Sequence, residues 1–315
     1  MSTAALTPFK HILEHLPLSL RMTLDQLDPE YGAVLEEIRL KSDTPLLLRF
    51  HQEEGFLTKD GRLVREPDST VRRVSGDELR RTVLLLSDSS FYALEEELRR
   101  GYITLPGGHR AGLAGRAVLE KGSIRTLKDI SSVNIRVARP VQGAAAYLLP
   151  QVLDAERRPC QTLIVSPPRA GKTTLLRDLA RMISDGECMP PLRVGMVDER
   201  SELAAMRDGV AQLPVGLRTD VLDSCPKAEG LMLLLRSMSP QVLVCDELGR
   251  EEDVLALEEA ANAGVKVITT AHGRDEKDLL SRPVLARLLS RNCFERIVIL
   301  SRRLGPGTIE RVIRV

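Results

Sequence analysis

Residues 163–174 read Leu163-Ile164-Val165-Ser166-Pro167-Pro168-Arg169-Ala170-Gly171-Lys172-Thr173-Thr174, an apolar run followed by a tight loop that ends in Gly-Lys-Thr-Thr. An amphipathic stretch from Leu175 to Ile183 comes next. This order predicts a strand, a phosphate-cradling loop and a helix, which is the layout of a P-loop. Backbone N–H groups of such a loop and the positive end of its helix hold phosphate oxygens. The stretch therefore predicts a nucleotide-binding α/β domain.

One position departs from the motif G-x-x-x-x-G-K-[ST], because Ser166 stands where the first glycine is expected. Gly-Lys-Thr also occurs in ordinary strand–turn–helix segments with an exposed lysine, so that alternative stays open. Ser is small, however, and Pro167 and Pro168 restrict φ in a way that favours a turn. We expect ATP as the ligand, with Lys172 on its β- and γ-phosphates and Thr173 on Mg²⁺. The predicted nucleotide-binding residues are Ser166, Pro167, Pro168, Arg169, Ala170, Gly171, Lys172, Thr173 and Thr174.

The composition is that of a soluble globular protein, with 43% hydrophobic and 28% charged residues. A length of 315 residues is typical of two domains. The net charge of +1 provides no electrostatic basis for nucleic-acid binding, so no nucleic-acid partner is expected. The five cysteines are scattered without a Cys-x-x-Cys pair, which predicts neither a zinc site nor a disulfide framework and fits a reducing cytosol.

No membrane segment is predicted. His11, Glu14 and His15 interrupt the apolar positions near the N-terminus, which argues against a signal peptide. The apolar runs are far shorter than the roughly 18–20 residues that span a bilayer. We therefore expect a cytoplasmic protein without direct membrane insertion, which reaches a membrane only through partners.

Aromatic residues divide the chain, because after residue 150 only Phe294 is aromatic. Two cores of different composition are therefore expected, with residues 1–145 forming a smaller α+β domain and 146–315 the P-loop domain. In the first domain we predict short helices within 7–28, strands at 35–40, 46–50 and 133–137, a helix from a Ser75–Glu78 capping box to Leu86, and a helix at 90–100.

Residues 101–116 are rich in glycine and predict a hairpin region. Two interpretations remain open for this segment. The glycines can serve turn geometry alone. Alternatively, the segment contacts a second subunit or a nucleotide, because Arg110 and Arg116 lie among the glycines.

The C-terminal part alternates strands with helices, which predicts a parallel sheet covered by helices on its faces. The predicted strands are 162–165, 192–197, 241–245, 265–270, 296–300 and 308–315, and the predicted helices are 172–184, 227–238, 251–263 and 275–291. A complete strand–helix unit, residues 192–238, lies between the P-loop helix and the strand that ends at Cys245. This insertion favours a RecA-like P-loop NTPase domain with an additional central strand.

Polar residues at strand ends extend the predicted site, because the carboxyl ends of parallel strands meet at one edge of a sheet. Asp246 is the expected Mg²⁺ ligand and Glu247 the residue that polarises the attacking water. Asp198 and Glu199 end another strand and would face the γ-phosphate or its metal, unless they form a solvated turn. Thr270 and His272 end a third strand, where an incidental histidine is the alternative to γ-phosphate sensing. The predicted catalytic residues are Glu247, Lys172, Glu199 and His272, and the predicted metal ligands are Thr173 and Asp246.

Transition-state charge in phosphoryl transfer is often neutralised by an arginine from the same or a neighbouring subunit. The sequence does not rank the candidates, which are Arg116, Arg125, Arg136, Arg218 and Arg236.

Several strings resemble the stage III sporulation protein AA family of endospore-forming bacteria, and they are spread over nearly the whole chain. They are residues 101–110, 167–179, 197–203, 218–230, 236–250 and 269–273. The family is similar, more distantly, to the hexameric ATPases of type II and type IV secretion and pilus systems. In that wider group an acidic box corresponds to Asp198–Glu202 and a histidine box to Thr269–Gly273. The group's Gly-Glu-x-Arg-Asp is Asp246-Glu247-Leu248-Gly249-Arg250 here, so the arginine stands one place later than in the group. Asp246 stands in place of the glycine, which supports Asp246 as a metal ligand.

The resemblance implies a homo-hexameric ATPase of the mother cell that powers or gates a membrane channel complex between mother cell and forespore. Two other functions remain open from the residues. One is a nucleotide-gated scaffold that binds ATP and hydrolyses little of it. The other is a nucleic-acid-stimulated RecA-like ATPase, which the near-neutral charge and the absence of Trp disfavour.

Overall fold

The computed structural model describes residues 7–51, 53–87, 97–291 and 293–315. The chain divides into two compact units, Met1–Arg139 and Pro140–Val315. The division predicted between residues 145 and 146 falls shortly after this point. Among the described residues, no helix is both long enough and apolar enough to cross a membrane.

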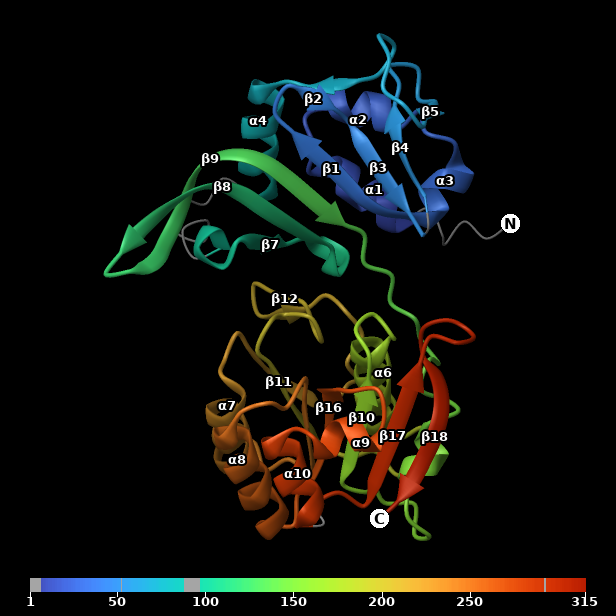
Figure 1. The fold of residues 1–315 in the computed structure, drawn as a ribbon, viewed down its shortest axis with the longest axis vertical. Helices are drawn as coiled ribbons and strands as arrows, with labels where there is room; N and C mark the ends of the chain where they lie inside the picture. The colour runs from blue at the N-terminus through green and yellow to red at the C-terminus, as the bar shows by residue number, and fades with distance from the viewer. Residues whose placement is uncertain (1–6, 52, 88–96, 292) are drawn as a thin grey trace. The chain divides into compact units, whose positions relative to one another are not determined.

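The N-terminal unit packs helices against an antiparallel sheet (Figure 1). Its helices are α1 (Thr7–Glu14), α2 (Leu18–Leu24), α3 (Pro29–Val34), α4 (Gly76–Leu86) and the 3₁₀ turn η2 (Pro106–Gly108). Its strands are β1 (Leu35–Lys41), β2 (Thr44–Pro45), β3 (Leu47–Phe50), β4 (Glu54–Leu57), β5 (Leu63–Val64), β6 (Arg73–Val74), β7 (Tyr102–Thr104), β8 (Arg110–Glu120) and β9 (Ser123–Arg136). The main sheet has the order β5-β4-β3-β1-β9-β8-β7, and β2 pairs with β6.

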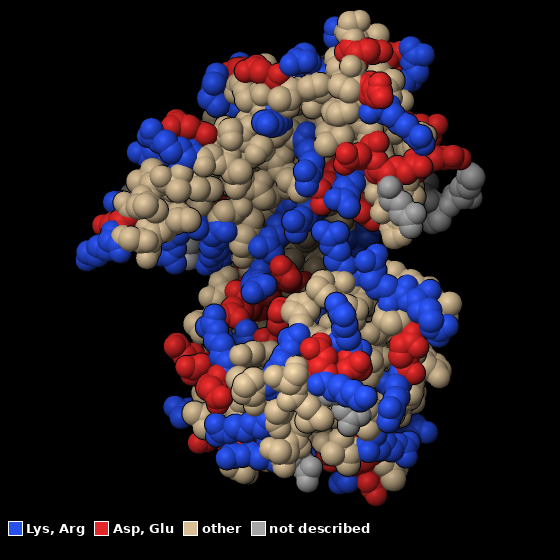
Figure 2. Space-filling model, viewed as in Figure 1, with Lys and Arg blue, Asp and Glu red and all other residues tan. Residues whose placement is uncertain are grey.

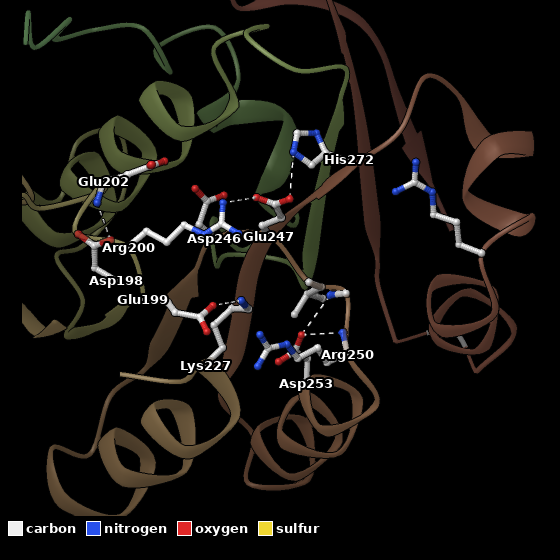
Figure 3. A pocket seen from close by; sticks show the side chains of 13 residues that line it. Asp198, Glu199, Arg200, Glu202, Lys227, Asp246, Glu247, Arg250, Asp253 and His272 are labelled. Atoms are coloured by element: carbon white, nitrogen blue, oxygen red, sulfur yellow. Dashed lines mark hydrogen bonds and ion pairs between the residues drawn. The ribbon is translucent and has the colours of Figure 1, made fainter. Parts of the chain in front are cut away.

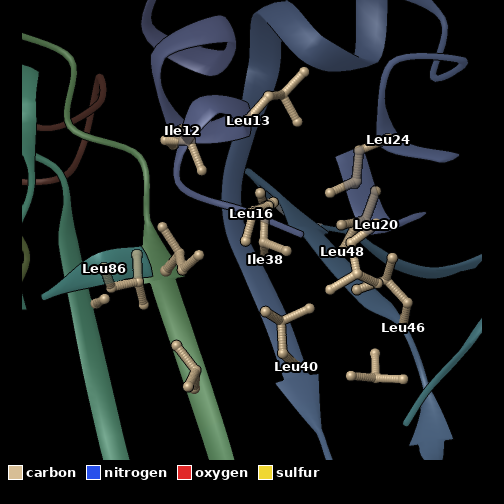
Figure 4. Close-up of a cluster of buried hydrophobic side chains, with 14 of the residues drawn as sticks. Ile12, Leu13, Leu16, Leu20, Leu24, Ile38, Leu40, Leu46, Leu48 and Leu86 are labelled. Atoms are coloured by element: carbon tan, nitrogen blue, oxygen red, sulfur yellow. The ribbon is translucent and has the colours of Figure 1, made fainter. Parts of the chain in front are cut away.

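The core of this unit lies between the helices and one face of the sheet (Figure 4). On β1, Ile38 and Leu40 are fully buried, whereas Arg39 and Lys41 are exposed. This alternation is the period of two that places successive side chains on opposite faces of a strand. The predicted α+β class of this domain is confirmed, and the predicted capping box at Ser75 is present at the start of α4.

The glycine-rich segment forms a longer hairpin than its sequence indicated. β8 and β9 pair from Arg110 to Arg136 around a tight turn at Lys121 and Gly122, whose φ angles are 50° and 80°. The helix predicted at 90–100 falls mostly outside the described residues, and residues 97–100 are helical.

The C-terminal unit is a mostly parallel sheet with the order β14-β11-β15-β16-β10-β17-β18, in which only β17 and β18 pair antiparallel. Its strands are β10 (Thr162–Ser166), β11 (Val194–Asp198), β14 (Thr219–Asp223), β15 (Val242–Cys245), β16 (Lys266–His272), β17 (Arg296–Ser301) and β18 (Thr308–Arg314), with β12 (Met206–Arg207) and β13 (Val210–Ala211) as a separate hairpin. Its helices are η3 (Leu149–Val152), α6 (Lys172–Asp185), α7 (Lys227–Ser237), α8 (Glu251–Asn262), α9 (Glu276–Leu280) and α10 (Pro283–Ser290).

Helices cover both faces of this sheet, as predicted. Along β10, Ile164 packs with the apolar side of α6, while Leu163 and Val165 pack with the layer formed by α7, α8 and α10. All the residues of β10 are buried, which is expected of a central parallel strand covered on both faces.

The sheet has the predicted additional central strand, but this strand is β16 and not β11, the strand of the inserted 192–238 unit. β16 lies between the P-loop strand β10 and β15, whereas the inserted strand β11 lies on the far side of β15. The helix predicted at 275–291 is also wrong in detail, because it is broken into α9 and α10. Pro283 is the first residue of α10, where its missing N–H is tolerated, and it disfavours helical geometry at Arg282.

Candidate active site

The P-loop candidate lies between a fully buried strand and a helix of 14 residues. Gly171 precedes α6 in a left-handed conformation with φ of 84°, and no side chain caps the helix at that residue. The first N–H groups of a helix lack partners within the helix. At this helix they are oriented to bind an anion, and the helix dipole favours a phosphate at the same end.

The loop is held from one side by the turn before β18. The Gly307 N–H donates to the Ala170 carbonyl at 2.8 Å, and a Cβ on Gly171 would lie 3.0 Å from the Gly307 nitrogen. Glycine is therefore needed at 171 both for its φ and for this close approach. Ser166 is buried and donates to the Pro167 carbonyl at 2.9 Å, so its hydroxyl is satisfied within the loop. Sequence reasoning missed the Gly307 contact, although the cluster Gly305-Pro306-Gly307 signals a tight turn there.

Two carboxylates follow β15. The Thr173 hydroxyl donates to Asp246 Oδ2 at 3.0 Å, and the Thr270 hydroxyl donates to the other oxygen, Oδ1. Glu247 has a left-handed φ of 51°, which is uncommon for a residue with a side chain, and its N–H donates to the Thr270 hydroxyl at 2.9 Å. A strained backbone fixed by its neighbours is a feature of functional sites. Thr270 therefore connects the two predicted site carboxylates.

Lys172, Glu247 and His272 form one cluster. Glu247 Oε1 lies 2.9 Å from His272 Nε2, and Lys172 Nζ lies 3.0 Å from the same nitrogen and 3.8 Å from Glu247 Oε2. A histidine nitrogen can accept from an ammonium group or donate to a carboxylate, but it cannot do both. With a proton on Nε2, His272 donates to Glu247 from that nitrogen and can accept from Lys172 at Nδ1, which lies 3.3 Å from Lys172 Nζ.

A pocket of about 400 Å³ lies beside this cluster (Figure 3). Glu199, Asp246, Glu247 and His272 all line it, and Lys172 contacts two of them. The structure therefore brings the predicted catalytic residues and Asp246 to one edge of the sheet, at the carboxyl ends of β11, β15 and β16.

Asp198 and Glu199, at the carboxyl end of β11, differ in their contacts. Glu199 forms an ion pair with the buried Lys227, which sequence reasoning missed because the two residues are far apart in the chain (Figure 3). Asp198 does not form a solvated turn, and it lines the same pocket as Glu199 and Asp246. It is buried and accepts N–H bonds of 2.8–2.9 Å from residues 202–204.

Burial raises the pKa of the Asp198 carboxyl, while the three amide donors act in the opposite direction. The donors satisfy the carboxylate within its own loop. We conclude that Asp198 shapes the loop after β11.

The arginines that line the pocket are Arg200, Arg250 and Arg282, and none was among the five sequence candidates. Arg200 Nη1 lies 3.9 Å from Glu247 Oε2. Of the five candidates, Arg218 donates to the Ser184 carbonyl of α6 at 3.2 Å. The sequence signal for Arg200 was its position directly after the strand end at Asp198 and Glu199.

A known protein family matches nearly the whole chain. The family model described as sporulation stage III, protein AA matches residues 9–314. The chain is 44% identical to stage III sporulation protein AA of Bacillus subtilis (strain 168) over 302 residues, which cover 96% of this chain and 94% of that protein.

Solved structures agree on the fold. The crystal structure of the pilus retraction motor PilT with bound ADP gives a TM-score of 0.58 at 18% identity, covering 85% of this chain and 74% of that one. The ATPase DotB of Legionella pneumophila gives 0.52 at 16% identity, covering 84% and 71%. At these identities the likeness establishes the fold alone, and the predicted α/β class is confirmed. Since the family model spans almost the whole chain and a relative of nearly equal extent is 44% identical, this chain belongs to the sporulation stage III protein AA family.

Proposed function

We propose that the chain binds ATP with Mg²⁺ at residues 166–174 and hydrolyses it, as a motor component of a membrane channel complex between mother cell and forespore. The observation that carries this proposal is the cluster in which Lys172 lies within 3.8 Å of both Glu247 and His272. A P-loop lysine beside a carboxylate and a histidine at adjacent strand ends is suited to phosphoryl transfer to water.

Each residue of the cluster has a role in this proposal. Lys172 neutralises charge on the β- and γ-phosphates. Glu247 orients and polarises the attacking water, a task that typically contributes about 10²–10⁴-fold to a rate. His272 contacts the Glu247 carboxylate and senses the γ-phosphate, so that the presence of the γ-phosphate affects Glu247 through this contact. Glu199 supports the site through its pair with Lys227, instead of acting on the phosphate directly.

The oxygen atoms at this site fit Mg²⁺, because the Thr173 hydroxyl and the Asp246 carboxylate are oxygen ligands that lie 3.0 Å apart. Within the described parts of the chain, no group of three or more His, Cys, Asp or Glu side chains is arranged to hold a metal. Phosphate oxygens and water would supply the other ligands, as is usual for Mg²⁺. The ion would neutralise charge on the phosphates.

The resemblance to hexameric secretion ATPases supports a homo-hexamer, and membership of the sporulation family supports membrane partners on the mother-cell side. We therefore propose a cytoplasmic protein that is held at the membrane by those partners.

ATP binding and steady-state hydrolysis by wild type and Lys172→Ala test the proposal. We expect wild type to hydrolyse ATP and Lys172→Ala to lose most of its affinity for ATP. A nucleotide-gated scaffold predicts ATP-dependent oligomerisation with negligible single-turnover hydrolysis, and that result would refute the motor.

A further inference from the structure

The β8–β9 hairpin extends beyond its sheet as a two-stranded segment, residues 115–129, which we call the arm (Figure 1). β8 pairs with β7 only over residues 110–112, and β9 pairs with β1 only over residues 132–136. In the described parts of the chain, the strands of the arm therefore pair only with each other. Leu127, near the base of the arm, packs against the core of the N-terminal unit. A two-stranded hairpin without further strands is marginally stable in water, so the outer part of the arm would gain from a partner surface.

The arm exposes apolar side chains. Leu119 and Ile124 pair across the two strands and are 65% and 48% exposed. Figure 2 shows uncharged surface along the arm, with basic side chains at its end. Its basic residues are Arg116, Lys121, Arg125 and Lys128, and its acidic residues are Glu120 and Asp129. The arm is thus an apolar projection with a net positive charge.

The C-terminal unit carries a surface of the complementary kind. A groove of about 740 Å³ lies between α7 and α8, and we call it the α7–α8 groove. Leu233 and Leu255 line it and are 52% and 56% exposed. Its charged lining consists of Glu229, Glu252 and Glu259 with the single base Arg236, so its net charge is negative.

We propose that the arm of one copy of this chain docks in the α7–α8 groove of a second copy. Docking would cover Leu119 and Ile124 with Leu233 and Leu255, and removal of such side chains from water is the main driving force of association. It would also set the basic arm against the acidic lining, which favours this pairing over arm-to-arm contact.

The pairing is heterologous, because the arm and the groove are different surfaces. Each copy therefore offers one of each, and repeated docking gives a ring if the rotation closes. The inference rests on the proposed function only for the premise that copies associate, and it does not require ATP hydrolysis.

Mixing two association-deficient variants tests the inference. One full-length chain carries Leu119→Asp and Ile124→Asp in the arm, and the other carries Leu233→Asp and Leu255→Asp in the groove. We expect each variant alone to self-associate at least about tenfold more weakly than wild type, as measured by sedimentation. An equimolar mixture should restore heterodimers, because the intact arm of the second variant meets the intact groove of the first.

Matched controls are Leu18→Asp and Val210→Asp, which place the same charge on exposed apolar residues outside both surfaces and should associate like wild type. Wild-type chains that stay monomeric, variants that associate like wild type, or a mixture that stays monomeric would each overturn the inference. So would a loss of binding to anionic lipid vesicles in the arm variant with self-association unchanged. ATP binding by both variants, measured in parallel, keeps failure of this interface distinct from failure of the nucleotide site.

Discussion

Replacement of Thr270 by valine removes one hydroxyl from the centre of the candidate site while keeping the shape of the side chain. Thr270 is fully buried, donates to Asp246 and accepts the Glu247 N–H at 2.9 Å. The substitution leaves that N–H without its partner, and it leaves the Asp246 carboxylate with one donor fewer.

The expected loss of stability follows from these two bonds. A buried N–H left unsatisfied costs about 1–3 kcal/mol, and a hydrogen bond to a charged group is worth about 1.5–3 kcal/mol. Water in the pocket that Asp246 and Glu247 line recovers part of this lost free energy. We therefore expect the free energy of unfolding to decrease by about 2–4 kcal/mol. Glu247 would also lose the contact that holds its left-handed backbone, so we expect kcat to fall about 10–100-fold, equivalent to about 1.4–2.8 kcal/mol.

The matched control is Thr269→Val, in the same strand and equally buried. The Thr269 hydroxyl contacts only the Cys245 sulfur at 3.4 Å among the interactions described, so its loss should cost less than about 1.5 kcal/mol and leave kcat near wild type. Urea unfolding and ATP turnover of the two variants provide the comparison. Equal turnover by Thr270→Val and Thr269→Val would refute the positioning role of the Thr270 hydroxyl.

Three further predictions concern separate parts of the molecule. Gly171→Ala should weaken ATP binding more than tenfold in a nucleotide titration, whereas Gly264→Ala, with a similar φ but nothing within 4 Å of its Cβ, should leave ATP affinity unchanged. Burial lowers the pKa of His109 from 6.5 to about 4, so between these values the unfolded chain is protonated and the folded chain is not. The stability of wild type relative to His109→Gln should therefore fall by up to about 1.4 kcal/mol per unit as the pH drops from 6.5 toward 4, and urea midpoints that stay parallel would contradict this. Asp198→Asn replaces one acceptor oxygen by an NH₂ group, which should cost about 2 kcal/mol in urea unfolding with little effect on ATP affinity; a selective loss of ATP binding would instead place Asp198 at the phosphate.

The parts of the fold with a local signal could be predicted from the sequence. The P-loop, the Asp246–Glu247 pair and the strand ending at His272 each follow from a short apolar run and the polar residues after it. The Ser75 capping box is equally local. The break at Pro283 and the Lys121–Gly122 turn also have local signals, and our predictions for those segments passed over them.

The remaining features depend on residues that are far apart in the chain. Strand order in a parallel sheet is set by how the crossover helices pack, so the sequence did not reveal that β16, and not the inserted β11, lies beside the P-loop strand. The Glu199–Lys227 pair and the contact of Gly307 with the P-loop likewise arise from tertiary packing.

Single-turnover hydrolysis by Glu247→Gln tests the proposed chemistry. Glutamine keeps the size of the side chain and removes the carboxylate that would polarise water. We expect ATP affinity within about threefold of wild type and a rate of hydrolysis at least about 100-fold lower, because only an interaction made in the transition state is lost. Hydrolysis of bound ATP at the wild-type rate would contradict the assignment of Glu247 and with it the proposed mechanism.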